Sequence, residues 1–373
     1  MSKLATISAP AHPVLRRVVV LGSLLLVILA FGGVLYENIA EARDRRFNPN
    51  PGKRFDVGGF KMNIDCTGTG NPTVILDSSL GDTFLSWRKV QPQISQFVRV
   101  CSYDRAGLGY SDPSPRPRTS KVIAEELHAL LQAAGIAPPY ILVGHSFGGY
   151  NVRLYQSLYP KEVVGMVLVD ASHPDQENRF PPELKTMEGT WQREAAFLAY
   201  ATPFGITRLL GFCEDDPKDR AAECNFRSSR ESLAELKAFP ESARQAAATG
   251  TLGDLPLIVL SHDPDKPSSE LSPEVAKPTN EAWEKMQEEL AHLSTRGTQT
   301  IAKNSAHYIQ SDRPDLVIDA VRKVVEEARA SVASSHLSDR NSPDTTMFTR
   351  LTHKQKRSGF DHPLLACNPK KLT

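Results

Sequence analysis

Short apolar runs alternate with longer stretches of helical periodicity from about residue 55 to about residue 330. Nearly continuous apolar runs predict strands buried on both faces, because both sides of such a strand contact apolar neighbours. We therefore expect the α/β class, with a mostly parallel sheet and helices on both of its faces. The runs that predict strands are 73–76, 98–103, 140–143, 163–169, 255–260 and 298–302.

The stretches between these runs predict helices. In residues 121–134 the apolar positions fall on one helical face, and Gly135 follows as a stop signal. Residues 281–293 and 316–328 predict further helices. Residues 55–64, before the first apolar run, alternate around a Gly-Gly pair, which predicts a hairpin.

Two segments break this rhythm. Residues 173–250 are helix-like and lie between two expected strands, so we expect them to form an inserted helical cap. From residue 333 the chain turns polar and irregular, and we expect 333–373 to be a mostly disordered tail. The globular domain is then expected to span residues 55–332.

The N-terminal region contains an apolar segment, residues 18–36, that carries no charge. A helix of this length is just sufficient to cross a membrane. Basic residues before it favour a cytoplasmic location for residues 1–17. The alternative is a signal peptide cleaved at the Ala-Glu-Ala sequence of residues 40–42. In both interpretations residues 37–54 form a polar linker and the domain lies outside the cytoplasm, either membrane-anchored or secreted or periplasmic.

Charge and cysteine content narrow the classes of function. The net charge is +1, from 44 basic and 43 acidic residues, which gives no reason to expect a nucleic-acid partner. None of the five cysteines stands in a C-x-x-C pair or a Cys/His cluster with zinc spacing. We therefore expect no structural metal, and the chemistry that the motifs below suggest requires neither a metal nor an organic cofactor.

The strongest chemical signal is Gly-His-Ser-Phe-Gly-Gly at residues 144–149. It follows the apolar run 140–143 and precedes the helical stretch 150–159, which is the strand–turn–helix context of a nucleophile elbow. The turn is so tight that the residues two positions before and two positions after the serine must be small. The helix N-terminus below it favours developing negative charge. Ser146 is therefore the candidate nucleophile; the alternative is a buried serine in a glycine-rich helix start.

A serine hydroxyl needs a base that removes its proton. His307 is the candidate, because it lies in a loop directly after the last expected strand, 298–302. Four other histidines fit less well, since they lie in the elbow, after earlier strands or within a helix: His145, His173, His262 and His292.

The order of three motifs resembles the α/β-hydrolase superfamily, over about residues 55–327. The motifs are the elbow, the sequence at 104–111 that is similar to D-x-x-G-x-G-x-S, and Ser-Ala-His at 305–307, close to Ser-Gly-His. The resemblance implies an eight-stranded, mostly parallel sheet of order 1-2-4-3-5-6-7-8. It also implies an esterase- or lipase-like serine hydrolase with a catalytic triad.

An oxyanion hole on this fold needs two backbone N–H donors. Phe147, directly after the nucleophile, is expected to supply one. The resemblance places the other at Leu80, in the loop 77–81 after the third strand. That loop lacks the His-Gly that is common in the family.

The acid that orients His307 has three candidates. The resemblance allows an acid after the seventh strand or after the sixth. Asp170, which follows the run 163–169, is the first candidate, and Asp265 and Asp263, in the loop after 255–260, are the alternatives. Two prolines and two aspartates in that loop also describe an ordinary turn.

The implied strand order suggests a use for some cysteines. Cys66 and Cys101 would lie on neighbouring strands, so a cross-strand disulfide is one expectation. Cys213 and Cys224 lie in the cap and are expected to close a short loop. The alternative is that all are small buried hydrophobic residues. Cys367 lies in the tail and is expected to be unpaired.

These features favour a serine hydrolase that cleaves carboxylic esters through an acyl-enzyme intermediate. The expected substrate is a small-molecule ester with an apolar group, because the cap carries Trp191, Phe197 and Phe204. Thioesterase, amidase, acyltransferase, carbon–carbon hydrolase and cofactor-free peroxidase activities are alternatives at the same site. Another alternative is a non-catalytic, membrane-tethered ligand-binding protein. Epoxide and haloalkane hydrolysis are disfavoured because they need a carboxylate at position 146.

Overall fold

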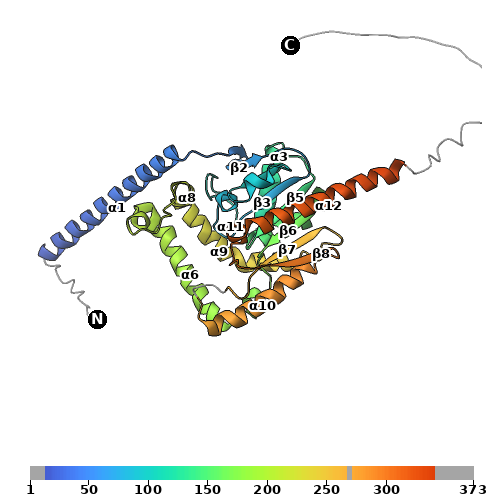
Figure 1. The fold of residues 1–373 in the computed structure, drawn as a ribbon. Helices are drawn as coiled ribbons and strands as arrows, with labels where there is room; N and C mark the ends of the chain where they lie inside the picture. The colour runs from blue at the N-terminus through green and yellow to red at the C-terminus, as the bar shows by residue number, and fades with distance from the viewer. Residues whose placement is uncertain (1–12, 267–270, 341–373) are drawn as a thin grey trace, which may run out of the picture. The chain divides into compact units, whose positions relative to one another are not determined.

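The computed structural model describes residues 13–266 and 271–340, built around one eight-stranded sheet (Figure 1). The strand order is β1-β2-β4-β3-β5-β6-β7-β8, with antiparallel pairing for β1–β2 and β2–β4 and parallel pairing elsewhere. The predicted class, hairpin and strand order are thus confirmed. The strands are β1 (Lys53–Asp56), β2 (Lys61–Thr67), β3 (Thr73–Asp77), β4 (Val100–Tyr103), β5 (Tyr140–His145), β6 (Val163–Val169), β7 (Leu257–His262) and β8 (Gly297–Ala302).

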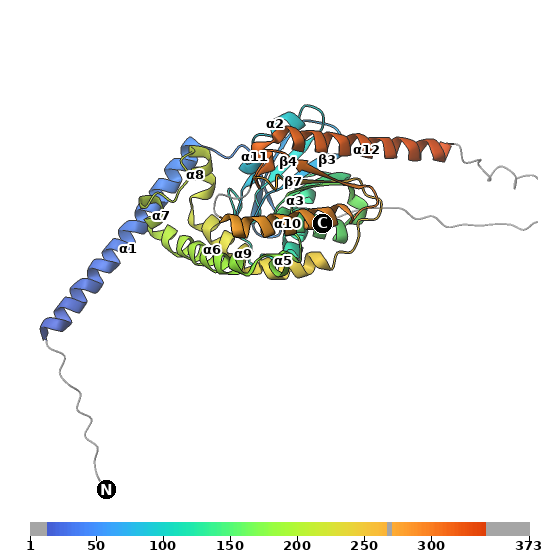
Figure 2. The ribbon, with the colours of Figure 1, turned by 60° about the horizontal axis from the view of Figure 1, so that its bottom comes forward.

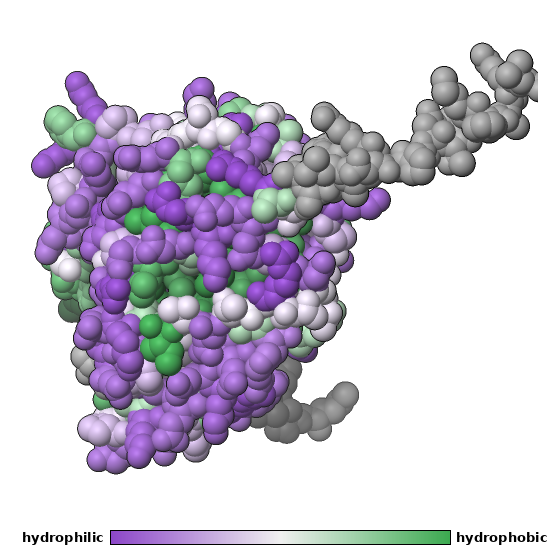
Figure 3. All heavy atoms as spheres, turned by 45° about the vertical axis from the view of Figure 1, so that its right-hand side comes forward, coloured by the Kyte–Doolittle hydropathy of each residue, from purple (hydrophilic) through white to green (hydrophobic). Residues whose placement is uncertain are grey.

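Helices cover both faces of the sheet. Side chains of α3, α4 and α10 join the apolar cluster on one face, and those of α2, α11 and α12 join the cluster on the other. The face drawn in Figure 3 is largely hydrophilic, with small hydrophobic areas between polar side chains. These elements are η1 (Phe84–Trp87), α2 (Gln91–Ile94), α3 (Ser120–Ala133), α4 (Gly148–Leu158), η2 (Pro160–Glu162), α10 (Pro273–Ala291), α11 (Ile309–Asp312) and α12 (Pro314–Arg340).

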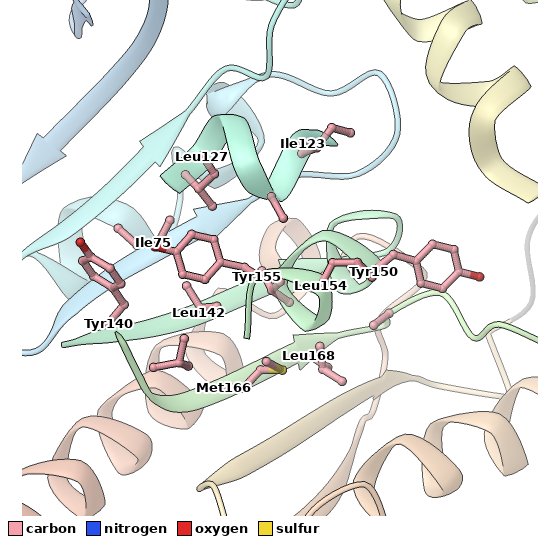
Figure 4. Packing of buried hydrophobic residues seen from close by; sticks show 14 of the residues in the cluster. Ile75, Ile123, Leu127, Tyr140, Leu142, Tyr150, Leu154, Tyr155, Met166 and Leu168 are labelled. Atoms are coloured by element: carbon pink, nitrogen blue, oxygen red, sulfur yellow. The ribbon is translucent and has the colours of Figure 1, made fainter. Parts of the chain in front are cut away.

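The central strands are apolar on both sides. Leu142 of β5 belongs to the cluster under α3 and α4, where Figure 4 shows it near Tyr155 and Met166. Val143, the next residue, belongs to the cluster under α12. Successive side chains of a strand point to opposite faces, so a strand covered on both sides needs an unbroken apolar run. This requirement explains why the strand positions could be predicted from the sequence.

The insertion between β6 and β7 is helical, as the sequence predicts. Its elements are α5 (Gln176–Arg179), α6 (Pro182–Ala201), η3 (Thr202–Phe204), α7 (Ile206–Leu209), α8 (Pro217–Glu223) and α9 (Phe226–Ala247). The Asn225 side chain caps α9 by accepting a hydrogen bond from the Ser228 N–H.

Both predicted disulfides are present in the structure. Cys66 of β2 and Cys101 of β4 lie opposite each other in the antiparallel register and are bonded. Cys213 and Cys224 are bonded within the cap and close the loop that contains α8. The first bond ties an outer strand to the sheet, and the second ties the end of the α7 region to the start of α9.

Helix α1 (Pro13–Phe47) contains the apolar segment 18–36 and is long and apolar enough to cross a membrane. Its apolar window is not buried in the protein. The prediction of a linker at 37–54 is wrong for its first part, because α1 continues to Phe47. No glycine or proline interrupts 37–47. Acidic residues of this part also pair with the cap, as Glu37 does with Arg208.

Helix α12 extends past the domain boundary predicted at residue 332 and ends at Arg340. No glycine or proline lies between 333 and 340, and adding residues to an existing helix is far easier than starting one. The predicted disordered tail therefore begins too early. Its remainder, 341–373, which includes Cys367, lies outside the described residues, as do residues 1–12.

Candidate active site

Ser146 occupies the turn between β5 and α4. Its φ angle is +51°, in the left-handed region that residues with side chains seldom adopt. The turn is held from both sides, since the Ser146 N–H donates to the Val169 carbonyl at 3.2 Å and Ser172 N–H donates to the Ser146 carbonyl at 3.0 Å. These contacts fix the serine at the carboxyl ends of β5 and β6.

The glycines around Ser146 are required by close packing. A Cβ atom at Gly144 would lie 2.6 Å from the Gly148 carbonyl oxygen. A Cβ atom at Gly148 would lie 2.5 Å from the carbonyl oxygen of Asp77, at the end of β3. Larger residues at either position would push the elbow away from the sheet. This agrees with the reasoning that selected the motif.

His307 lies in the loop between β8 and α11, against the elbow. His145 Nε2 lies 3.0 Å from the His307 carbonyl oxygen, and the centroids of the two rings are 4.7 Å apart. Burial and the neighbouring His307 lower the pKa of His145 to about 3, so its neutral ring acts as a support. Among the described residues no hydrogen bond joins Ser146 Oγ to the His307 ring; such bonds often tighten only when substrate binds.

Asp170 is the carboxylate that meets His307. It follows β6, is fully buried, and has Oδ2 2.6 Å from His307 Nδ1. Its own φ angle is +43°, so the backbone turns sharply as it leaves the strand. With Nδ1 held by the carboxylate, Nε2 is the His307 nitrogen left for proton transfer.

Two further side chains hold Asp170. His262 Nδ1 lies 2.9 Å from Oδ2, and its backbone N–H donates to Oδ1 at 3.0 Å. The indole Nε1–H of Trp283 donates to Oδ1 at 2.8 Å. Burial raises the pKa of Asp170, but the charges and hydrogen bonds of His262 and His307 outweigh burial and hold it well below its usual range. Asp170 therefore stays ionised beside the imidazole.

Neither of the alternative acids, Asp265 and Asp263, has a described contact with His307. Asp263 Oδ2 accepts from the Asn304 N–H at 2.9 Å, and both aspartates pair with Lys303. The Asp265 side chain is 86% exposed. The structure thus brings one of the three candidates, Asp170, to the histidine.

The two expected oxyanion donors are at the right places in the chain. Phe147 is the N-cap residue of α4, and neither its N–H nor that of Leu80 donates to another group of the described residues. Gly148 packs directly against the Asp77 carbonyl, so the elbow and the loop that carries Leu80 touch. Neither N–H group is therefore occupied by another group of the described residues.

A buried arginine fixes the loop that carries Leu80. Arg105 donates to the carbonyl oxygens of Ser78 at 2.8 Å and Ser79 at 2.6 Å. It also pairs with Glu235 of α9, whose Oε2 accepts from the Gly81 N–H at 2.9 Å. Burial lowers the pKa of Arg105, but Glu235 outweighs it, so the guanidinium remains charged. The cap and the loop are thereby locked together.

Sequence reasoning missed four residues that support the site. Arg105 lies inside the recognised 104–111 motif, so a signal for it existed. The sequence contains no signal for the other three. Glu235 and Trp283 lie in amphipathic helices, and His262 was considered as a base instead of as a partner of Asp170. Only the folded chain shows what they contact.

A cavity of about 210 Å³ lies within the cap and reaches this loop at Gly81. Its lining includes Gly81, next to Leu80, and Leu198 and Phe212 of the cap. Glu223 also lines it and accepts from Thr83 Oγ1 at 2.8 Å. Burial, aided by nearby acidic groups, raises the pKa of Glu223 to about 8. Within residues 13–266 and 271–340 no cluster of His, Cys, Asp or Glu is arranged to hold a metal ion.

Comparison with known proteins agrees with this fold. The sequence profile described as alpha/beta hydrolase fold matches residues 72–202, which hold the elbow and Asp170. The solved structure of a thermophilic esterase from Thermogutta terrifontis has a TM-score of 0.54 at 21% identity and covers 74% of this chain and 98% of that one. At this identity the likeness concerns the fold.

Two relatives are informative by sequence. The uncharacterized protein YqjL of Bacillus subtilis is 28% identical over 258 residues, 69% of this chain and 85% of the relative. A 2-hydroxy-6-oxo-2,4-heptadienoate hydrolase of Pseudomonas putida is 33% identical over 131 residues, 33% of this chain and 46% of the relative. Three other relatives are covered over 43% to 51% of their lengths.

Proposed function

The chain belongs to the α/β-hydrolase superfamily, and on that premise we propose that it is a serine hydrolase of carboxylic esters. The observation that carries the proposal is the 2.6 Å approach of Asp170 to His307 beside the Ser146 elbow. A buried, ionised carboxylate on one imidazole nitrogen leaves the other as a base, which is the arrangement that activates a serine.

The first half of the proposed reaction forms an acyl-enzyme. Ser146 Oγ bonds to the ester carbonyl carbon as His307 takes its proton. The carbonyl oxygen becomes an oxyanion, which the N–H groups of Phe147 and Leu80 stabilise. The bond to the alcohol oxygen then breaks, and His307 gives that oxygen the proton.

The second half repeats these steps with water. His307 removes a proton from the water as its oxygen attacks the acyl carbon. The bond to Ser146 Oγ breaks and His307 returns the proton to it, releasing the carboxylic acid. Asp170 stabilises the imidazolium in both halves without taking a proton itself. Apart from the ester and water, every group that these steps use belongs to this chain.

The proposed location is a membrane, through the segment 18–36 of α1, with the domain outside the cytoplasm. Two observations support an uncleaved anchor over a signal peptide. Helix α1 runs unbroken through residues 40–42, and Glu41 pairs with Arg227 of the cap at 2.9 Å. A cleavage site there would be helical and held against the domain.

A second candidate is carbon–carbon bond hydrolysis at the same site. The Pseudomonas putida relative, a 2-hydroxy-6-oxo-2,4-heptadienoate hydrolase, favours it, since the match covers 131 residues at 33% identity. Both reactions use a serine, a histidine base and an oxyanion hole. They differ in the bond that breaks, so product analysis separates them.

The test is turnover of the purified full-length chain on nitrophenyl esters of increasing acyl length and on a dienoate keto acid. We expect nitrophenol release by the wild type and its loss in Ser146→Ala. Turnover of the keto acid alone would assign the second candidate. Ester turnover that persists in Ser146→Ala would overturn the proposal.

A further inference from the structure

The cap exposes a group of large apolar side chains that no described element covers. We call residues Phe204–Phe212 the cap apolar loop. Leu209 is 70% exposed, Leu210 61% and Phe212 60%. Contiguous apolar exposure of this kind marks a surface that meets an apolar partner.

The cap apolar loop touches the last turn of the apolar segment in α1. A Cβ atom at Gly33 would lie 2.4 Å from the Phe204 carbonyl oxygen. A Cβ atom at Gly205 would lie 2.5 Å from the ring of Tyr36. Gly33 and Tyr36 stand about 5 Å apart along the helix axis, at about 1.5 Å per residue. The loop therefore lies level with the end of the span.

Charged contacts begin at Glu37, directly after Tyr36, and include Arg208 of the cap apolar loop itself. Arg208 pairs with Glu37 at 3.2 Å and with Asp44 at 2.6 Å, and Arg227 pairs with Glu41 at 2.9 Å. Glu37 is only 3% exposed. These pairs follow the span directly and bind α1 to the cap, beside α7 and α8 (Figure 2). The depth of the loop is thus tied to the depth of the helix.

We propose that the cap apolar loop lies in the surface of the lipid bilayer that α1 spans, and that lipid esters enter the active site there. A span that ends at Tyr36 puts that residue at the interface between hydrocarbon and headgroups. Phe204 and Gly205 contact the same turn, so the neighbouring exposed leucines meet lipid. We assign the lipid bilayer as the apolar partner because α1, the helix that spans it, contacts the cap apolar loop.

A cavity within the cap extends from this surface to the loop that carries Leu80. Phe212, in the loop, and Gly81, next to the oxyanion donor Leu80, line the same space of about 210 Å³. The disulfide between Cys213 and Cys224 holds the end of the loop to the start of α9. An acyl chain that leaves the bilayer at Phe212 would follow this space to Gly81, next to Leu80. This part rests on the proposed ester hydrolase activity and names its substrate class, a lipid ester.

The position of the loop is tested with an environment-sensitive fluorophore on Leu209→Cys, in a Cys367→Ser background. The full chain is reconstituted in phosphatidylcholine vesicles with and without brominated lipid. The matched control is Leu158→Cys, an exposed leucine at the end of α4. We expect quenching at position 209 and none at 158. Equal signals at the two positions would overturn the proposal. So would shielding of position 209 that depends on protein concentration and ignores brominated lipid, since it would assign the loop to a second copy.

Substrate entry is tested with Leu209→Glu against Leu158→Glu. A charge at a lipid-facing leucine removes its apolar burial, and we expect turnover of a long-chain ester in vesicles to fall about tenfold. The Leu158→Glu variant should stay within about twofold of the wild type. An equal fall in turnover of a short soluble ester would overturn the proposal. If the wild type cleaves no ester although position 209 is quenched, the proposed function fails and the bilayer contact stands.

Discussion

Asp170 Oδ2 lies 2.6 Å from His307 Nδ1, although 137 residues separate them in the chain. Asp170 follows β6 and His307 follows β8, so the pairing exists only because parallel strands bring their carboxyl ends to one edge of the sheet. Ser146 follows β5 at the same edge. The account of the site rests on this convergence.

Replacing Asp170 by Asn should test the assignment of the acid. The amide keeps the shape but cannot hold the imidazolium, so we expect kcat to fall about 10³- to 10⁴-fold. Asp265→Asn, at an exposed residue that pairs with Lys303, is the matched control and should leave kcat within about twofold. Steady-state kinetics on a soluble ester give both numbers. A large loss in the control with little loss in Asp170→Asn would reassign the acid.

Trp283→Phe should show whether the support of Asp170 matters. The change keeps an aromatic ring but removes the N–H that donates to Oδ1 at 2.8 Å. A hydrogen bond to a charged group contributes about 1.5–3 kcal/mol, so we expect kcat to fall roughly 10-fold or more with little change in KM. Trp191→Phe, at a partly exposed cap tryptophan, should leave kcat unchanged. Equal kinetics for the two variants would mean that Trp283 is a packing residue only.

Gly148→Ala should disrupt the elbow. Its Cβ atom would lie 2.5 Å from the Asp77 carbonyl, so we expect a cost of about 1–3 kcal/mol and loss of most activity. The control is Gly189→Ala in α6, where a Cβ atom meets nothing within 4 Å and alanine favours the helix. Thermal unfolding should separate the two, with Tm lowered in the first and unchanged or raised in the second. A neutral Gly148→Ala would contradict the packing described for the turn.

These variants also mark where sequence reasoning succeeded. Gly144 and Gly148 flank Ser146 because close packing excludes larger residues, and that need is visible as a motif. The strands could be predicted for a similar reason, because a strand that is buried on both faces requires an unbroken apolar run in the sequence. Local constraints of this kind leave local traces in the chain.

The sequence contains no comparable local signal that identifies the acid that meets His307. Asp170 and Asp265 both follow apolar runs and both stand in loops rich in aspartate and proline. What separates them is the side chain that each meets in the folded chain, His307 for Asp170 and Lys303 for Asp265. The linker prediction at 37–54 failed similarly, because the pairing of Glu37 with Arg208 joins residues 171 positions apart.

Stability should depend on pH through Glu223. Burial raises its pKa to about 8, so the folded chain binds this proton more tightly than the unfolded chain. The stabilisation is complete below the ordinary glutamate pKa of about 4.3 and is lost as pH rises through about 8. Glu223→Gln stays neutral, so we expect Tm at pH 9 to exceed that of the wild type by roughly 2–4 °C, about 1 kcal/mol.

At pH 5 the same variant should match the wild type in thermal unfolding. Glu284→Gln, at an exposed glutamate of α10, is the control and should show no difference between the two pH values. A Glu223→Gln variant whose Tm difference is the same at pH 5 and pH 9 would contradict the burial argument.

The most direct test of the central claim is reaction of the folded full-length chain with a fluorophosphonate, followed by peptide mass spectrometry. The account predicts one covalent adduct, on Ser146, that disappears in Ser146→Ala and forms far more slowly in His307→Ala. An unmodified Ser146 in folded protein, or an adduct on another serine, would contradict it.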